Sequence, residues 1–193
     1  MVVPSSVMED ICNDDVSALS RWLDGAPGRV NEYDEGLGCG WPYSLLMLCA
    51  ERDATICARY LIARGADVNE RNPNPDTINL ETDKPSLITA LHVAVEGSRP
   101  LMIALLTEAG ADVDARMYNG RTPLGKVLVS LRQSDRYPVV KALLRAGASI
   151  DMCGMPSRTA EELLEEGTRG GQYYNGGYTS FRRLLRDVRA AGS

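Results

Sequence analysis

Aromatic side chains and histidine are scarce in this sequence. Its 193 residues include one phenylalanine, two tryptophans and a single histidine, His92. A thick aromatic core is therefore excluded. Thin layers of small aliphatic side chains are expected in its place, because Ala, Leu, Val and Gly are abundant.

Cysteine occurs in an odd number and without close pairs. The five cysteines are Cys12, Cys39, Cys49, Cys57 and Cys153. No CxxC spacing is present, so neither a disulfide framework nor a zinc site is indicated, and a reducing compartment is expected. No apolar run reaches the length of a signal peptide or a membrane span. We therefore expect a soluble protein of the cytoplasm or the nucleus.

Positive charge is also in short supply over the chain as a whole. The formal net charge is -5 and the sequence pI is about 5.0. A field of this sign repels nucleic acids and anionic membranes, so neither is expected as a partner. With 44% hydrophobic and 24% charged residues, the length and composition predict one globular domain with a sizeable core.

What the sequence does contain is an internal repeat. Three segments each combine a leucine-rich helix end, a glycine and a short extended stretch: LIARGADVNER at 61–71, LLTEAGADVDAR at 105–116 and LLRAGASIDM at 143–152. Gly65, Gly110 and Gly147 fall where a helix needs a left-handed residue at its C-terminus, which glycine supplies without a Cβ penalty. Each helix is expected to end there, and a hairpin-like connection is expected to follow.

A second motif marks the start of a helix pair. TALHVA begins at Thr89 and TPLG begins at Thr122. The first matches the T-P-L-H-x-A signature of the ankyrin repeat except for alanine in the proline slot, and the second has glycine in the histidine slot. The spacings from Thr89 to Gly110 and from Asp114 to Thr122 also agree with that family. The sequence therefore resembles the ankyrin-repeat family, which implies an all-α solenoid of about five helix-turn-helix units with projecting β-hairpin loops.

The repeat divides the chain, taken as a single domain of residues 1–193, into five units. These are an N-terminal cap at 1–31, three units at 32–69, 70–114 and 115–151, and a C-terminal cap at 152–193. An insertion at about 72–86 lengthens one hairpin by about a dozen residues relative to the family, and GLGCGW lengthens the hairpin before the second unit. The first insertion is rich in Pro, Asn, Asp and Thr, so a mobile loop is expected.

His92 is the first candidate for chemistry. As a general base it needs a serine, cysteine or carboxylate beside it, and no neighbouring motif supplies one. As a zinc ligand it needs three further ligands, and no cysteine pair is suitably spaced. The resemblance implies instead that His92 hydrogen-bonds to backbone and to Thr89. Thr89 and Thr122 are expected to cap their helices, with Pro123 in a first turn. We therefore expect no catalytic residue, no metal, no cofactor and no enzymatic activity.

The hairpin tips are the candidate binding surface. In the ankyrin family the residues between the hairpin Asn or Asp and the next threonine project toward the concave side and vary with the partner. The tips of this sequence carry methionine, tyrosine and arginine, which are enriched at protein interfaces. Some of the methionines could instead fold back as core fillers. The candidate partner-binding residues are Tyr33, Arg116, Met117, Tyr118, Arg121, Met152, Met155 and Arg158.

The resemblance implies a protein-interaction module, a scaffold or adaptor that is monomeric on its own. It is expected to bind a protein or peptide through its concave face and hairpin tips. The alternative is a substrate-targeting domain of a larger enzyme or of a ubiquitin-ligase-type adaptor. Two segments carry further hypotheses. Asn69 occupies a position hydroxylated in some ankyrin proteins of animals, and the arginine-rich amphipathic stretch 179–189 is either a solenoid cap or a basic contact site.

Overall fold

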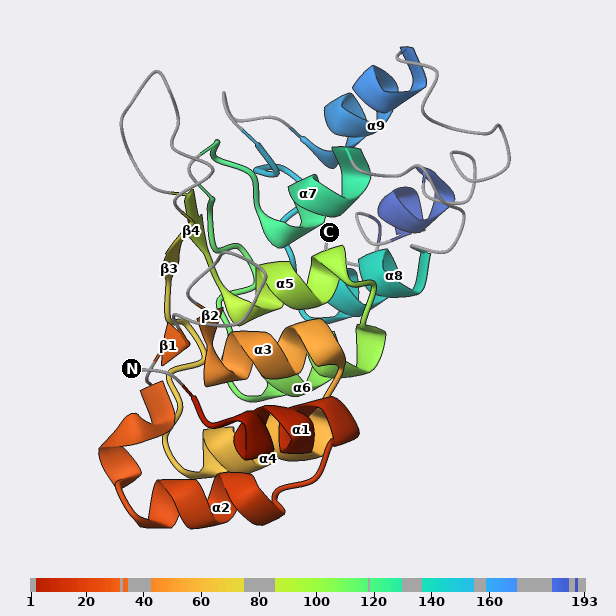
Figure 1. Cartoon of the computed structure of the whole chain (residues 1–193). Helices are drawn as coiled ribbons and strands as arrows, with labels where there is room; N and C mark the ends of the chain where they lie inside the picture. Colours follow the sequence, from red (N-terminus) through yellow and green to blue (C-terminus); the bar gives the residue numbers. More distant parts are fainter. Residues whose placement is uncertain are drawn as a thin grey trace. The chain divides into compact units, whose positions relative to one another are not determined.

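The computed structural model of the chain consists mainly of short α-helices (Figure 1). It describes residues 3–31, 33–34, 43–74, 86–117, 119–129, 137–154, 159–169, 182–187 and 190. Two short antiparallel strand pairs accompany the helices in this described part. The all-α class expected from the sequence is confirmed.

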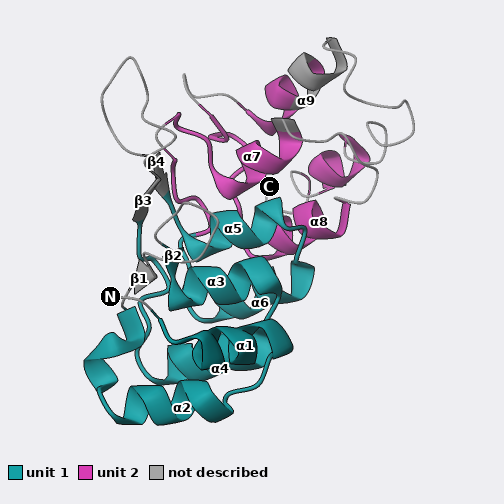
Figure 2. Cartoon of the chain, in the orientation of Figure 1, with its two compact units in different colours: residues 1–112 teal, residues 113–193 magenta. Residues whose placement is uncertain are grey.

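The chain forms two compact units, residues 1–112 and 113–193 (Figure 2). Unit 1 contains α1 (Ser5–Asn13), α2 (Ser17–Asp24), the 3-10 helix Pro27–Asn31, β1 (Tyr33–Asp34), β2 (Tyr43–Ser44), α3 (Leu45–Arg52), α4 (Thr55–Ala63), β3 (Asn72–Asn74), β4 (Ser86–Ile88), α5 (Ala90–Glu96) and α6 (Pro100–Glu108). Unit 2 contains α7 (Pro123–Val129), α8 (Tyr137–Arg145), α9 (Ala160–Arg169) and the helical residues 182–187. The boundary falls in the hairpin between the third and fourth predicted repeats. That residues 1–193 form a single domain stays a prediction.

Unit 1 is a stack of three helix pairs: α1 with α2, α3 with α4, and α5 with α6. The first helices contact one another in the order α1, α3, α5, and α4 contacts α6. Figure 1 shows these pairs as successive layers. They correspond to the predicted units 1–31, 32–69 and 70–114.

The first helices α3 and α5 are buried over most of their length. Helix α3 contacts α1, α5 and its own partner α4. As a result, every residue from Leu45 to Ala50 is buried, and so is every residue from Ala90 to Val95 in α5. Second helices bury only one side, which in α4 consists of Cys57, Ala58 and Leu61. The core is therefore a series of thin aliphatic layers, since each layer is only one helix pair thick.

Two sets of left-handed residues shape the pairs. Between the helices of each pair in unit 1 the turn residue has φ of 54°, 61° or 56°, at Asp14, Asp53 and Ser98 respectively. After the second helices the residue is glycine with φ of 90°, 92° or 88°, at Gly65, Gly110 and Gly147 respectively. A side chain at the glycine positions would be strained, because L-residues rarely adopt this backbone conformation.

Side chains in the hairpins of unit 1 bond to the backbone of the next repeat. The Oδ1 atom of Asn31 accepts from the Asp67 N–H at 2.9 Å. The side-chain amide of Asn69 makes two such bonds. Its Nδ2 donates to the Gly110 carbonyl at 3.0 Å, and its Oδ1 accepts from the Asp112 N–H at 2.7 Å. These bonds join backbone groups that no helix satisfies, so they tie each repeat to its neighbour.

Unit 2 continues this pattern with an aspartate. The Oδ1 atom of Asp114 accepts from the Ser149 N–H at 2.9 Å. A carboxylate accepts but cannot donate, so Asp114 reproduces only one of the two bonds that Asn69 makes. Within unit 2, α7 contacts its partner helix α8 and the next first helix α9, as α3 contacts α4 and α5 in unit 1.

Acidic side chains also link the first repeat to the second. The Oδ1 atom of Asp14 accepts from the N–H groups of Ile56 and Cys57 at 2.8 and 3.0 Å. Both amides lie in the first turn of α4, where no helical carbonyl is available and a negative charge is favourable. Asp14 therefore caps a helix of the next repeat.

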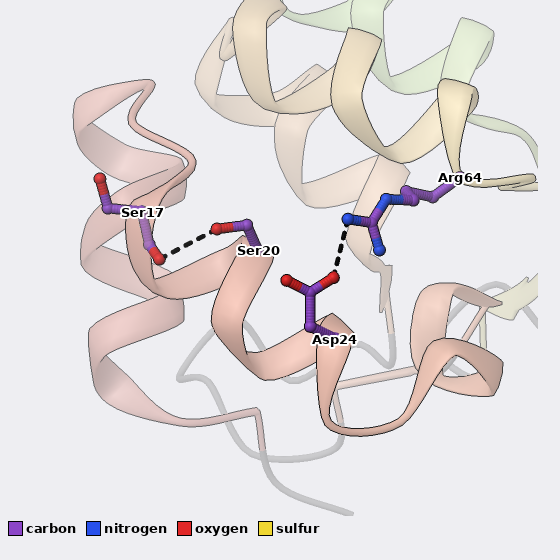
Figure 3. A network of polar contacts seen from close by, with 4 residues as sticks. All are labelled: Ser17, Ser20, Asp24 and Arg64. Carbon is purple, nitrogen blue, oxygen red and sulfur yellow. Dashed lines mark hydrogen bonds and ion pairs between the residues drawn. The ribbon is translucent and has the colours of Figure 1, made fainter.

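The outer edges of α2 and α4 are joined by an ion pair (Figure 3). The guanidinium of Arg64 donates to Asp24 at 2.8 Å and stacks 4.8 Å from the centre of the Tyr60 ring. Figure 3 also shows the Ser20 hydroxyl bonded to the Ser17 carbonyl, at 3.1 Å. Both members of the ion pair are well exposed, so it contributes little to stability compared with the buried layers.

The predicted insertion at about 72–86 has ordered ends. Residues 72–74 form β3 and pair antiparallel with β4, with Asn72 opposite Ile88 and Asn74 opposite Ser86. The expectation of a loop was therefore wrong at 72–74 and 86, because a ladder of backbone bonds offsets the poor strand propensity of Asn and Pro. Residues 75–85 lie outside the described residues.

We predict that Asn69→Ala lowers the free energy of unfolding by about 1–2 kcal/mol, because it removes two hydrogen bonds between repeats. The measurement is urea denaturation followed by far-UV circular dichroism.

The control is Asn13→Ala at an exposed position of α1, which should change stability by less than about 0.5 kcal/mol. If both variants unfolded at the same urea concentration, the prediction would be wrong. The Asn69 bonds would then add no more to stability than the hydrogen bonds to water that replace them in the unfolded chain.

Candidate functional site

His92 is completely buried at the start of α5. Its Nδ1 atom accepts from the Thr89 N–H at 3.3 Å and lies 2.9 Å from the Thr89 hydroxyl oxygen. Because Nδ1 accepts from an amide, the neutral ring carries its proton on Nε2. Thr89 and His92 together form a capping box. The geometry therefore uses Nδ1 to close the first turn of a helix.

The equivalent helix starts use other side chains. In the second repeat the hydroxyl of Ser44 accepts from the Met47 N–H at 3.3 Å. In the fourth repeat the hydroxyl of Thr122 accepts from the Gly125 N–H at 3.2 Å. Ser44 and Thr122 are both buried. The cap is thus kept in each case, while the histidine slot is filled differently.

Gly125 occupies the histidine slot of α7, and the reason is steric. A Cβ atom built on Gly125 would lie 1.8 Å from the carbonyl oxygen of Cys153 and 2.8 Å from its carbonyl carbon. The same carbonyl accepts from the Thr122 N–H at 3.3 Å. The backbone of the following hairpin therefore passes where a side chain would otherwise project, and only glycine leaves room for it.

Cys153 anchors this hairpin. Its side chain is fully buried, and its thiol donates to the Ser149 carbonyl at 3.1 Å. Burial raises the pKa of the Cys153 thiol to about 12, although a hydrogen bond with Thr122 acts in the opposite direction. The thiol is therefore neutral at physiological pH, and it holds the hairpin in place as an apolar group rather than as a nucleophile.

The tip before the fourth repeat is a preformed turn. The Met117 N–H donates to the Arg121 carbonyl at 3.0 Å, and the Gly120 N–H donates back to the Met117 carbonyl at 2.9 Å. Gly120 has φ of 70°, and the Asn119 side chain accepts from the Arg121 N–H at 3.1 Å. Arg116, Met117 and Arg121 are partly exposed around this turn.

The tip before the fifth repeat exposes a methionine. Met152 is 49% exposed and directly precedes Cys153. The Thr122 N–H donates to the Cys153 carbonyl. Arg121 directly precedes Thr122 and Met152 directly precedes Cys153, so this hydrogen bond holds the backbones of the two tips next to each other. The structure therefore brings the two tips of unit 2 together, with two arginines and two methionines partly or largely exposed.

Four of the predicted tip residues cannot be placed in this way. Tyr118, Met155 and Arg158 lie outside the described residues. Tyr33 belongs to β1, where its backbone pairs with Ser44, and its side chain is outside the description. The part of the surface that the structure describes thus consists of Arg116, Met117, Arg121 and Met152, which we call the tip cluster.

The two units carry charges of opposite sign. Unit 1 has 18 aspartates and glutamates against 8 lysines and arginines, a net charge of -10. Unit 2 has 8 acidic against 13 basic residues, a net charge of +5. The whole-chain value of -5 is therefore the sum of an acidic unit 1 and a basic unit 2, and the tip cluster belongs to the basic unit.

In the residues that the structure describes, no three His, Cys, Asp or Glu side chains gather as a metal site requires. In the same part of the chain, every helix is too short or too polar to span a bilayer.

Comparison with known proteins agrees with this geometry. A family model described as ankyrin repeats (3 copies) matches residues 46–152. Ankyrin repeat and SOCS box protein 6 of Homo sapiens is 30% identical over 144 residues, which are 74% of this chain and 30% of that protein. The nuclear factor NF-kappa-B p105 subunit of Gallus gallus is 37% identical over 89 residues, 46% of this chain and 8% of that protein. Protein fem-1 homolog A of Danio rerio is 35% identical over 96 residues, 42% and 15% of the respective chains. This chain thus spans at most 30% of the length of these relatives.

We predict that Gly125→Ala destabilises unit 2 by about 3 kcal/mol or more, because the new methyl group meets backbone that cannot rotate away. Amide hydrogen exchange measured by mass spectrometry should show faster exchange in α7 and around Cys153.

Gly28→Ala is the matched control, since a Cβ atom there has no neighbour within 4 Å. Unchanged exchange in α7 of the Gly125→Ala protein would mean that the Cys153 hairpin moves aside without cost.

Proposed function

The chain belongs to the ankyrin-repeat family, and we propose that it is a protein-interaction module that binds its partner through the concave face and hairpin tips. Repeats of this family bind other proteins and are not catalytic modules. The observation that carries the proposal is the tip cluster: two methionines and two arginines displayed by two neighbouring turns of unit 2.

Contacts within the chain define the conformation of both turns without any partner. The Met117–Arg121 tip is closed by two backbone bonds and one side-chain bond, and the Met152 tip is fixed by Cys153 and by the absence of a side chain at Gly125. A preformed surface loses little conformational entropy on binding, so more of the contact energy remains as affinity.

The composition of the tip cluster favours a protein partner. Met152 exposes about half of its side chain, and burying it against an apolar group of a partner is favourable in proportion to the area covered. Arginine binds carboxylates and backbone carbonyls in a fixed geometry and is frequent at interface centres. A nucleic-acid site would call for arginine or lysine with stacking aromatic groups, and the tip cluster offers methionine instead.

Partner capture by the full chain tests the proposal. Wild-type protein and Met117→Ala/Met152→Ala are immobilised, exposed to lysate, and compared by quantitative mass spectrometry. We expect recovery of the bound protein to fall at least about tenfold, because truncating central interface residues removes about 1.4 kcal/mol or more.

Glu9→Ala in α1 is the control, since Glu9 is exposed and distant in sequence from the tips. Both variants should keep the helical circular dichroism and the melting temperature of the wild type. Equal capture by all three proteins would contradict the proposed surface, and a large drop in melting temperature would identify the methionines as core residues.

A second function is favoured by the relatives. Ankyrin repeat and SOCS box protein 6 is named for a SOCS box in addition to its repeats, and this chain covers 30% of it. We propose as the alternative that the chain is the substrate-targeting part of a larger enzyme or of a ubiquitin-ligase-type adaptor. Sequencing the full-length transcript tests it: coding sequence is expected to continue past Ser193, and a stop codon there would contradict it.

We propose that the protein resides in the cytoplasm or the nucleus. The supporting observation is that Cys12, Cys49, Cys57 and Cys153, the cysteines that the structure describes, are free thiols. Cys49 and Cys57 are buried in unit 1, and their mutual hydrogen bond together with burial raises the pKa of Cys49 well above its usual value. Thiols are the stable form of cysteine in reducing compartments.

A further inference from the structure

The outward side of α4 and α6 is unusually apolar for an exposed surface. Along each helix the outward residues recur at i, i+3 and i+7, which is one face of an α-helix. They are Ile56, Arg59 and Ala63 in α4, and Leu101, Ala104 and Glu108 in α6. We call these six residues, all of them exposed, the outer face.

Two large apolar side chains lie at the N-terminal end of the outer face. Ile56 is 57% exposed and Leu101 is 73% exposed. They are the second residues of α4 and α6, so they occupy equivalent positions in adjacent repeats whose helices are in contact. Both residues also come three positions after the left-handed residue of the inter-helix turn. Ser17 has the same spacing from Asp14 and is polar, so the repeat itself does not require an apolar residue there.

Helix α6 is apolar on both sides. Its inward side buries four large residues, Met102, Ile103, Leu105 and Leu106, and its outward side presents Leu101 and Ala104. A helix that is apolar all round is normally covered all round. Large apolar side chains exposed at equivalent positions of two helices in contact favour an interaction surface over isolated exposure.

The two charges of the outer face have no partner within the described chain. Arg59 and Glu108 are both exposed, and neither forms an ion pair with any residue that the structure describes. One is positive and lies on α4, and the other is negative and lies on α6. The outer face therefore carries a charge pattern that is complementary to itself.

We propose that the outer face of unit 1 binds the outer face of a second copy of this chain. A two-fold axis that runs parallel to the helices places α4 of one copy against α6 of the other. Ile56 then meets Leu101 of the second copy twice, because the contact is the same on both sides of the axis. Arg59 faces Ala104 of the second copy, and Glu108 lies four residues further, about 6 Å along the helix axis. An arginine side chain spans that distance.

The net charge of unit 1 opposes this contact. Two units of -10 repel each other, but the Debye length is about 8 Å at physiological ionic strength, so charges outside the contact are largely screened. The contact itself contains Arg59 and Glu108 in equal number. We therefore expect a weak homodimer that tightens between low and physiological salt, whereas an interface held mainly by ion pairs would weaken.

The dimer is independent of the tip cluster. The outer face uses second helices of unit 1, and the tip cluster uses hairpins of unit 2. A dimer presents two tip clusters, which raises the apparent affinity for a partner with two binding sequences. The sequence alone led us to expect a monomer, because composition does not show that Ile56 and Leu101 are exposed.

Sedimentation velocity of the purified full chain, from low to high micromolar concentration, tests the proposal without any partner. Wild-type protein should pass from monomer to dimer across this range. Leu101→Glu should raise the dimer dissociation constant at least about tenfold, since it places a charge in an apolar contact. Asn13→Glu adds the same charge on α1 and is the matched control. A wild type that stays monomeric at every concentration overturns the proposal and leaves the outer face to a different protein.

Charge reversal tests the register. Arg59→Glu and Glu108→Arg should each weaken the dimer about five- to tenfold, because each replaces exposed ion pairs with like charges. The double variant Arg59→Glu/Glu108→Arg should restore wild-type association. All positions are exposed, so circular dichroism should be unchanged in every variant. A double variant that is no tighter than either single variant overturns the paired arrangement, and unaltered dimerisation of Leu101→Glu overturns the surface itself.

Discussion

Each helix pair in this protein depends on its neighbours to cover its apolar surface. Helix α3 shows why: six successive residues are buried, which is more than one partner helix can cover. It needs α1, α5 and α4 around it. A repeat of this kind has no core of its own, so stability comes from nearest-neighbour contacts and the stack folds as a linear array. The thinness of the layers explains why one phenylalanine suffices in 193 residues.

Because the repeats depend on one another, the hairpins between them also contribute to the stability of the stack. Asn31, Asn69 and Asp114 each accept a hydrogen bond from the backbone of the next repeat, so the register between repeats is set by directional bonds as well as by apolar contact. In unit 2 the close contact between α7 and the next hairpin requires glycine at position 125, because the Cys153 backbone occupies the space that a side chain at this position would need. The turns that carry the tip cluster adjoin these contacts in unit 2. The same hydrogen bonds therefore hold the repeats together and define the conformation of these turns.

The packing of the repeats also determines which residues remain exposed and can bind other molecules. Residues that face neighbouring repeats stabilise the fold and are not available to a partner. His92 is an example, because it is buried and bonds to Thr89. Residues that face outward, at the tips or on the outer sides of second helices, have no such duty. Exposed apolar side chains in those places, such as Met152 and Leu101, add little to the stability of the fold. The functional proposals therefore rest on them.

The local features of the fold could be predicted from the sequence. The period, the left-handed glycines at Gly65, Gly110 and Gly147, and the threonine caps follow from short-range backbone chemistry, which a few neighbouring residues specify. The tip residues could be proposed as well, because their composition departs from that of ordinary turns. Even the charge difference between the units is present in the sequence, although the boundary at residue 112 had to come from the structure.

Only the tertiary structure decided the rest. The stretch PLMIALL gives no sign that Leu101 points outward while Met102 points inward, because a uniformly apolar helix has no periodicity to reveal its orientation. The need for glycine at position 125 depends on the Cys153 backbone, 28 residues further along the chain. Both facts arise when distant segments come into contact. The sequence by itself determined the helix starts after Thr89 and Thr122 and the helix ends before Gly65, Gly110 and Gly147, because neighbouring residues specify them. Packing determined which side of each helix is left to meet another molecule.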